Sequence, residues 1–232
     1  MKFKKLLAAV LIFSAFSAKA QLYIDNAQLT IQSGASVVVQ GDVNSNSNIL
    51  GDGKLVMKGS GAQNFNMNGN MVPNLEIDNA ANVILTGNAQ VGTSLTMTNG
   101  KLNLGANNLT IGASATIAGA DASKFIVTDS TGKLVKTNLG STAFTYPVGN
   151  SATTYNPVSI SNSGTADNIG VRCLANVLKQ GTTGTALTTD VVDASWDISE
   201  DVAGGSNLSV TANWNATDEL TGFNRSKGGI AN

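Results

Sequence analysis

The sequence predicts an all-β protein, in which an N-terminal β-solenoid is followed by antiparallel β-sandwich-like units. Short apolar or alternating runs recur along the chain, separated by Gly and Asn. No stretch after residue 20 shows the apolar spacing of an amphipathic helix. Asn, Gly, Thr and Ser make up about two fifths of the chain, which is typical of tight turns between short strands.

The first twenty residues have the parts of a secretory signal peptide. Lysines at the N-terminus precede an apolar run from Leu6 to Phe16, and Ser17-Ala18-Lys19-Ala20 follows as a small-residue exit. The apolar run is too short to span a bilayer. We therefore expect cleavage between Ala20 and Gln21, and a mature chain that is secreted or exposed at the cell surface without a transmembrane segment.

Charge and composition exclude several functional classes. Loss of the lysine-rich leader leaves a mildly acidic chain without a basic tract, so a nucleic-acid partner is not expected. Histidine is absent, which excludes a histidine base or metal ligand. Cys173 is the single cysteine, so no intramolecular disulfide can form, and its alternating apolar neighbours predict a buried thiol.

Residues 21–120 are expected to form the solenoid. The segment Leu22–Ala27 recurs, with one substitution, as Leu75–Ala80, and each copy leads into further short strands. Such self-similarity is typical of a solenoid, whose coils bury their apolar faces against neighbouring coils. We expect three strands per coil of roughly 20–25 residues, and about four coils. An antiparallel sandwich made from the same strands is the alternative.

The remaining sequence is expected to form antiparallel units. In residues 121–180, Phe125–Thr128 and Lys133–Lys136 flank an Asp-Ser-Thr-Gly loop, which predicts a β-hairpin within a sandwich-like unit. Residues 181–189 are rich in Gly and Thr and are expected to be a linker. Residues 190–232 are expected to begin a further sandwich module. Since no strand follows to close its sheet, we expect the natural protein to continue past Asn232.

With these segments in view, the chain resembles the large exported surface proteins of Bacteroidota, which often carry a type IX secretion sorting domain. The segments that carry the resemblance are Leu75–Ala80 with its following coils, Phe125–Lys136, Phe144–Gly149, Tyr155–Val158, and Trp196 with Asn213-Trp214. The resemblance implies a β-rich stalk or adhesin-like scaffold on the cell surface, and export by the type IX route. The sorting domain itself would lie beyond Asn232 and is not in this sequence.

No residue pattern predicts a catalytic site, a cofactor site or a metal site. The densest carboxylate cluster flanks a predicted strand and is interpreted as a solvated loop rather than a glycosidase pair or a calcium site; it comprises Asp190, Asp193, Asp197, Glu200 and Asp201.

Two other groups of oxygen ligands are interpreted as turns. The alternating oxygens of Asp42–Asn48 lack the central glycine and the bidentate glutamate of an EF-hand. Asp25 and Asp78 recur at matching places in the two repeated segments, where a turn or capping role is expected.

These observations favour a non-catalytic scaffold that presents ridges of Asn, Thr and Ser to glycans or to other cell-surface proteins. The alternative is a secreted polysaccharide lyase or glycosidase of the β-helix kind. Such an enzyme needs acidic and basic groups together on one face of the solenoid. The two arginines, Arg172 and Arg225, both lie outside the predicted solenoid, so the scaffold is the preferred interpretation.

Overall fold

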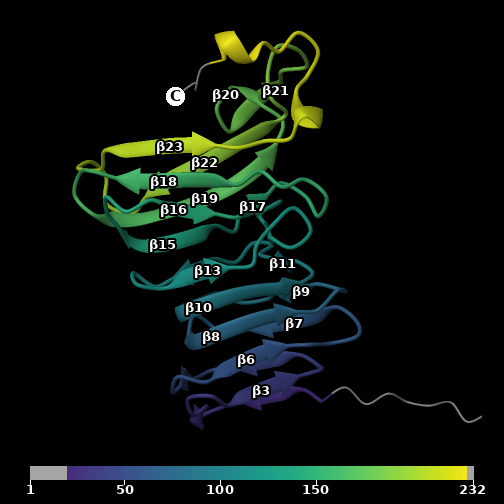
Figure 1. Ribbon diagram of the computed structural model, residues 1–232, viewed down its shortest axis with the longest axis vertical. Coiled ribbons are helices and arrows are strands. Elements are labelled where there is room, and N and C mark those ends of the chain that lie inside the picture. Colours follow the sequence, from purple (N-terminus) through teal and green to yellow (C-terminus); the bar gives the residue numbers. More distant parts are fainter. Residues whose placement is uncertain (1–19, 229–232) are drawn as a thin grey trace, which may run out of the picture.

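The computed structural model describes residues 20–228. Their strands stack along one axis into an elongated solenoid, which continues into antiparallel sheets at the C-terminal end (Figure 1). The predicted fold class is thereby confirmed, and the sandwich alternative for residues 21–120 is wrong. Residues 1–19, which hold most of the expected signal peptide, lie outside the described residues.

Each full coil of the solenoid has three sides, here called faces A, B and C. Face A is a seven-stranded parallel sheet, in the order β1 (Leu22–Ile24), β4 (Val43–Ser45), β7 (Gln63–Asn66), β9 (Val83–Leu85), β11 (Leu102–Asn103), β14 (Ile126–Val127) and β17 (Val148–Gly149).

Faces B and C are connected by two long strands, β8 (Met71–Asp78) and β10 (Ala89–Asn99), which run across the corner between them. Face B contains the first part of both long strands together with β2 (Leu29–Thr30), β5 (Ile49–Leu50), β12 (Leu109–Ile111) and β15 (Leu134–Leu139). Face C contains the second part of both long strands together with β3 (Ser36–Val39), β6 (Lys54–Met57) and β13 (Thr116–Ala118).

The coil repeat is close to its predicted length. Paired residues on face A lie 19 to 24 positions apart in the sequence, as between Val83 and Leu102 or between Leu102 and Ile126. The ladder makes about six turns and crosses residue 120, because β14 pairs in parallel with β17 further along the chain.

The core consists of columns of apolar side chains that stack from coil to coil. On face C, Leu55, Leu75 and Leu95 occupy one ladder position and are fully buried. On face A, Phe65 and Leu85 do the same. Because each inward side chain packs on its equivalents one coil above and below, the solenoid is held together by nearest-neighbour contacts.

The hairpin predicted for Phe125–Lys136 does not form. Its two strands, β14 and β15, belong to different faces and pair with the preceding coil, through Leu102 with Ile126 and Leu109 with Leu134. The apolar side chain of each strand is buried by stacking along the solenoid axis, which a hairpin would not achieve.

At the end of the solenoid the pairing changes from parallel to antiparallel. Strand β15 is parallel to β12 on one side and antiparallel to β19 (Asp167–Ala175) on the other, and β19 then pairs with β22 (Ala194–Glu200). A second antiparallel sheet contains β16 (Phe144–Tyr146), β18 (Val158–Asn162) and β23 (Leu208–Ala212). We call this part of the molecule the crown. It comprises β16, β18, β19 and residues 176–228, whereas β17 belongs to face A.

The crown also contains its own short elements. β20 (Leu178–Gln180) and β21 (Thr183–Ala186) form an antiparallel pair that overlaps the expected linker. Two 3₁₀ turns, Ala216–Asp218 and Arg225–Lys227, follow β23. The strands after residue 190 do not form a sheet of their own, since β22 extends the sheet of β19 and β23 extends that of β18.

Candidate functional site

Asp197, the central member of the carboxylate cluster, is engaged by two cations. Arg172 Nε donates to its Oδ2 at 2.7 Å and Lys133 Nζ donates to its Oδ1 at 3.1 Å. Burial on its own would raise the pKa of Asp197, but the hydrogen bonds and charges of these two partners lower it. The three side chains connect β22 and β19 to the loop before β15, so Asp197 is fixed in a structural ion-pair network.

Two other carboxylates of that cluster, those of Glu200 and Asp201, are bound separately. Glu200 Oε1 accepts from the Gly204 N–H and Asp201 Oδ2 accepts from Asn168 Nδ2, each at 2.8 Å. Asp190 adopts a left-handed backbone (φ 64°) and its side chain packs against Gly222. Among residues 20–228, no three Asp, Glu or Cys side chains gather as a metal site.

The polar segment Asp42–Asn48 connects neighbouring coils. Both carboxylate oxygens of Asp42 accept from Asn64, one from its backbone N–H at 2.8 Å and one from its side-chain amide at 3.2 Å. Asn46 Nδ2 donates to Asp25 one coil earlier, and it in turn accepts from Asn68 one coil later. These oxygens bind groups of the neighbouring coils. The turn interpretation is wrong for the middle of the segment, because Val43–Ser45 form strand β4, and it applies only to the residues on either side.

Cys173 is fully buried in β19, as its alternating neighbours predict. Burial raises the pKa of its thiol to about 12, with a smaller contribution from the negative charge of Asp218. A thiol with this pKa is protonated at neutral pH and is not a nucleophile.

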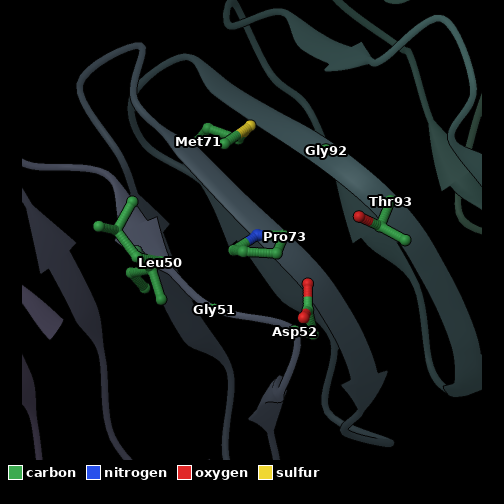
Figure 2. Close-up of a pocket in the computed structure, with 8 residues that line it drawn as sticks. Leu50, Gly51, Asp52, Met71, Pro73, Gly92 and Thr93 are labelled. Carbon is green, nitrogen blue, oxygen red and sulfur yellow. The ribbon is translucent and has the colours of Figure 1, made fainter. Parts of the chain in front are cut away.

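A shallow hollow on face B has a volume of about 250 Å³ and lies beside the two long strands (Figure 2). Met71 and Pro73 of β8 line one side, and Gly92 and Thr93 of β10 line another. Asp52 is its one titratable side chain, and a glycosidase needs a pair of carboxyl groups. The hollow therefore lacks the groups of the alternative enzymatic function.

The outward side chains of face C bind one another along the axis. Lys54 Nζ contacts Glu76 Oε2 at 2.8 Å, and Thr98 Oγ1 donates to the other oxygen of Glu76 at 2.7 Å. The hydrogen bond from Lys54 lowers the pKa of Glu76 against the opposing effect of burial, with a further contribution from Thr98. Lys58 and Asp78 form a second pair at 2.6 Å. The polar groups of this face are thus largely occupied.

Face A presents carboxamides with free donors, and we call its outward residues the amide face. They are Tyr23, Asn44, Asn64, Asn66, Ile84 and Asn103, which alternate with buried residues on adjacent strands. The Oδ1 atom of Asn66 accepts from the Asn68 N–H at 2.9 Å, and that of Asn103 accepts from the Gly105 N–H at 2.8 Å. Their Nδ2 groups have no hydrogen-bond partner among the described residues.

Two exposed apolar side chains accompany these amides. Tyr23 is 61% exposed and is the ladder partner of Asn44, and Ile84 is 40% exposed and is the ladder partner of both Asn64 and Asn103. The Oδ1 atom of Asn44 is shielded from solvent and has no partner among residues 20–228. The amide face therefore combines oriented donors with two apolar contact points.

The sequence predicted ridges of Asn, Thr and Ser but not the residues of this face. Asn64, Ile84 and Asn103 are 20 and 19 positions apart in the sequence. That they are neighbours on face A can be deduced only when the positions of the corners in each coil are known. The one usable signal is the alternation of polar and buried residues around Phe65, which assigns Asn64 and Asn66 to the outside of one strand.

No helix within residues 20–228 combines the length and the hydropathy needed to cross a membrane. Comparison of this chain with protein-family models, with curated proteins and with solved structures finds no match.

Proposed function

We propose that the protein is a non-catalytic scaffold, secreted or exposed at the cell surface, whose amide face binds glycans. The single observation that carries this proposal is the set of oriented carboxamides on face A, beside Tyr23 and Ile84. Carboxamide N–H groups donate to sugar hydroxyls, and an aromatic ring offers an apolar surface with a polar tip to a sugar ring.

The spacing of the amide face suits a polymer. Strands in one sheet lie about 4.8 Å apart, so equivalent side chains repeat at that interval along the solenoid. A glycan chain lying along the axis would meet several weak donors in succession, and their combined binding would exceed that of any one contact. The rigid ladder holds these donors in place before binding, which reduces the entropy lost on association.

Support for a scaffold rather than a lyase or glycosidase comes from the use of the charged groups. On face C, Glu76 and Asp78 are paired with lysines of the preceding coil. At the base of the crown, Asp197 is paired with Arg172 and Lys133. A catalytic carboxylate must be available to substrate, and these carboxylates are occupied by the fold.

Binding to immobilised polysaccharides tests the proposal at the level of side chains. The double variant Asn66→Asp/Asn103→Asp retains the oxygens that accept from the backbone and removes both free donors. We expect it to lose at least about tenfold in affinity, or about 1.4 kcal/mol. The control, Thr110→Asp/Thr116→Asp, adds the same charge to faces B and C opposite the uncharged residues Gln90 and Ser94, and is expected to bind like the wild type. Equal binding by both variants would contradict the assignment of face A.

A further inference from the structure

The first coil of the solenoid, residues 20–41, leaves the end of the core open. Strands β1 and β3 are terminal in their sheets, and β2 pairs only with β5, so each has one neighbour among the described residues. In β1, the Leu22 N–H donates to Asp42 and the Ile24 carbonyl accepts from Asn46, both in the next coil. The backbone groups of Tyr23 between them face the open end, since successive residues of a strand alternate in direction.

The apolar side chains of this coil are less covered than their equivalents one coil further on. Leu22, Leu29 and Val37 are partly exposed. Their ladder partners are at most 1% exposed; these are Val43, Ile49 and Leu55. Ile24, Ile31 and Val39 of the same coil are 3–5% exposed, so the core is only partly open to solvent at this end. Repeat proteins ordinarily close such an end with a polar capping unit.

The three terminal strands also lack the features that protect an exposed edge. Their sequences, Leu-Tyr-Ile, Leu-Thr and Ser-Val-Val-Val, contain no charge and no proline. Asp25 is the one charged residue in the coil, and it already accepts from Asn46 one coil away. By contrast β22, which ends its sheet in the crown, carries Asp197 and Glu200.

We propose that the N-terminal coil is a self-association surface, on which a second copy of the chain docks through the same coil. Rotation about a two-fold axis perpendicular to the solenoid axis keeps the handedness of the coil. It reverses the direction in which the chain runs around the solenoid axis. Every open strand edge of one copy then meets an antiparallel edge of the other, and the two partly exposed core cross-sections bury each other. Such a self-complementary interface is the usual form of a symmetric dimer.

The low charge of this coil favours a second copy over a charged partner. An identical coil brings only Asp25 as a like charge, while its apolar residues and backbone groups complement those already present. The dimer would project the two crowns in opposite directions. It would also align two amide faces into one longer surface, a consequence that depends on the proposed function, whereas the dimer itself does not.

The mass of the exported protein in solution provides the first test. The full chain is expressed with its leader in a secreting bacterium, and mass spectrometry identifies the N-terminus of the product. Light scattering at tens of micromolar is expected to give twice the mass of the denatured chain, and high salt is expected to preserve the dimer because few charges take part. A monomer would overturn the proposal and leave a different protein, or retained residues 1–20, as the occupant of this end.

A pair of charge substitutions locates the interface. Tyr23→Lys/Val38→Lys places charges on two of the three terminal strands, β1 and β3, and is expected to give a monomer with unchanged circular dichroism. Ile84→Lys removes an exposed apolar residue from an interior strand and is expected to leave the dimer intact. Persistence of the dimer in the first variant, or its loss in the second, would overturn the proposal.

Spin labels distinguish a two-fold dimer from a head-to-tail chain. A label at Gln32→Cys, in the first coil, is expected to give a short distance to its copy. A label at Ser209→Cys, on the exposed side of β23 in the crown, is expected to give none within range. The buried Cys173 does not compete for labelling. A short distance between positions 32 and 209 of different copies would establish head-to-tail stacking and overturn the two-fold arrangement.

Discussion

The solenoid and the crown are built from strands of similar length, yet their pairings differ in range. In the solenoid, each strand finds its partners one coil away, as Leu55 does in Val37 and Leu75. In the crown the separation is uneven: Cys173 lies opposite Trp196, 23 residues later, and Ile160 lies opposite Val210, 50 residues later. The solenoid is therefore a sum of similar contacts between neighbouring coils, whereas the crown combines near pairings with distant ones in antiparallel sheets.

A cavity in the middle of the solenoid tests this difference most strongly. Phe65 is fully buried, so Phe65→Ala is expected to cost about 3–5 kcal/mol in the free energy of unfolding. Hydrogen exchange should accelerate in the adjacent coils and change little in β18 and β19, because coils couple mainly to their neighbours. The control Ile84→Ala, on the exposed side of β9, should cost well under half as much. Uniform acceleration across the chain would contradict the separation of the two regions.

The solenoid and the crown meet at β15, and we expect the stability of this strand to depend on Lys136. This side chain is 6% exposed, and its Nζ donates to the carbonyls of Gly112, Ala113 and Ala115 at 2.6–2.9 Å. Burial lowers the pKa of its ammonium group. We expect Lys136→Met to cost about 2 kcal/mol, because it leaves buried carbonyls without donors.

A second lysine provides the matched control for that change. Lys101 Nζ also donates to a backbone carbonyl, that of Ser123 at 3.1 Å. It lies over the ring of Phe125, as Lys136 Nζ lies over that of Phe144. Because this site is exposed to solvent, Lys101→Met is expected to cost only a few tenths of a kcal/mol by urea titration. Equal costs for the two variants would show that burial of Lys136 does not matter to the junction.

Acid is expected to loosen the crown through Asp197. Its pKa in the folded state is lowered, so its contribution to stability is present above the ordinary carboxyl value of 3.8 and is lost as pH falls below it. Asp197→Asn should lower stability at neutral pH by about 1 kcal/mol and reduce the loss between neutral and acidic pH. Thermal unfolding as a function of pH measures both effects. Parallel pH profiles for variant and wild type would contradict this role.

The smallest effect is expected in the rate at which Cys173 reacts with a thiol reagent. Its burial and its pKa of about 12 should keep alkylation at pH 8 slow until the crown opens. The labelling rate should rise in Asp197→Asn and remain unchanged in Phe65→Ala. Rapid labelling of the native wild type would show that β19 is accessible.

The contrast in pairing range explains what the sequence could predict. Repetition of Leu22–Ala27 at Leu75–Ala80 indicated coils, although the two copies do not stack on each other: the first lies in β1 on face A and the second in β8 on face C. The hairpin at Phe125–Lys136 was wrong because strand signals do not reveal which partner buries a strand. A lysine in a strand ordinarily indicates a solvated side chain, and only the structure shows that three carbonyls surround Lys136. The amide face could not be predicted either, because its residues come from different coils and are brought together only by the fold.

Recovery of a polysaccharide after binding tests the central claim of a non-catalytic scaffold most directly. The purified protein is incubated with a polysaccharide that it retains, and both the retained fraction and the number of reducing ends are measured over time. We expect retention with no new reducing ends, and reduced retention by Asn66→Asp/Asn103→Asp. Accumulation of new reducing ends by purified protein, or failure to retain any of a broad panel of polysaccharides, would contradict this claim.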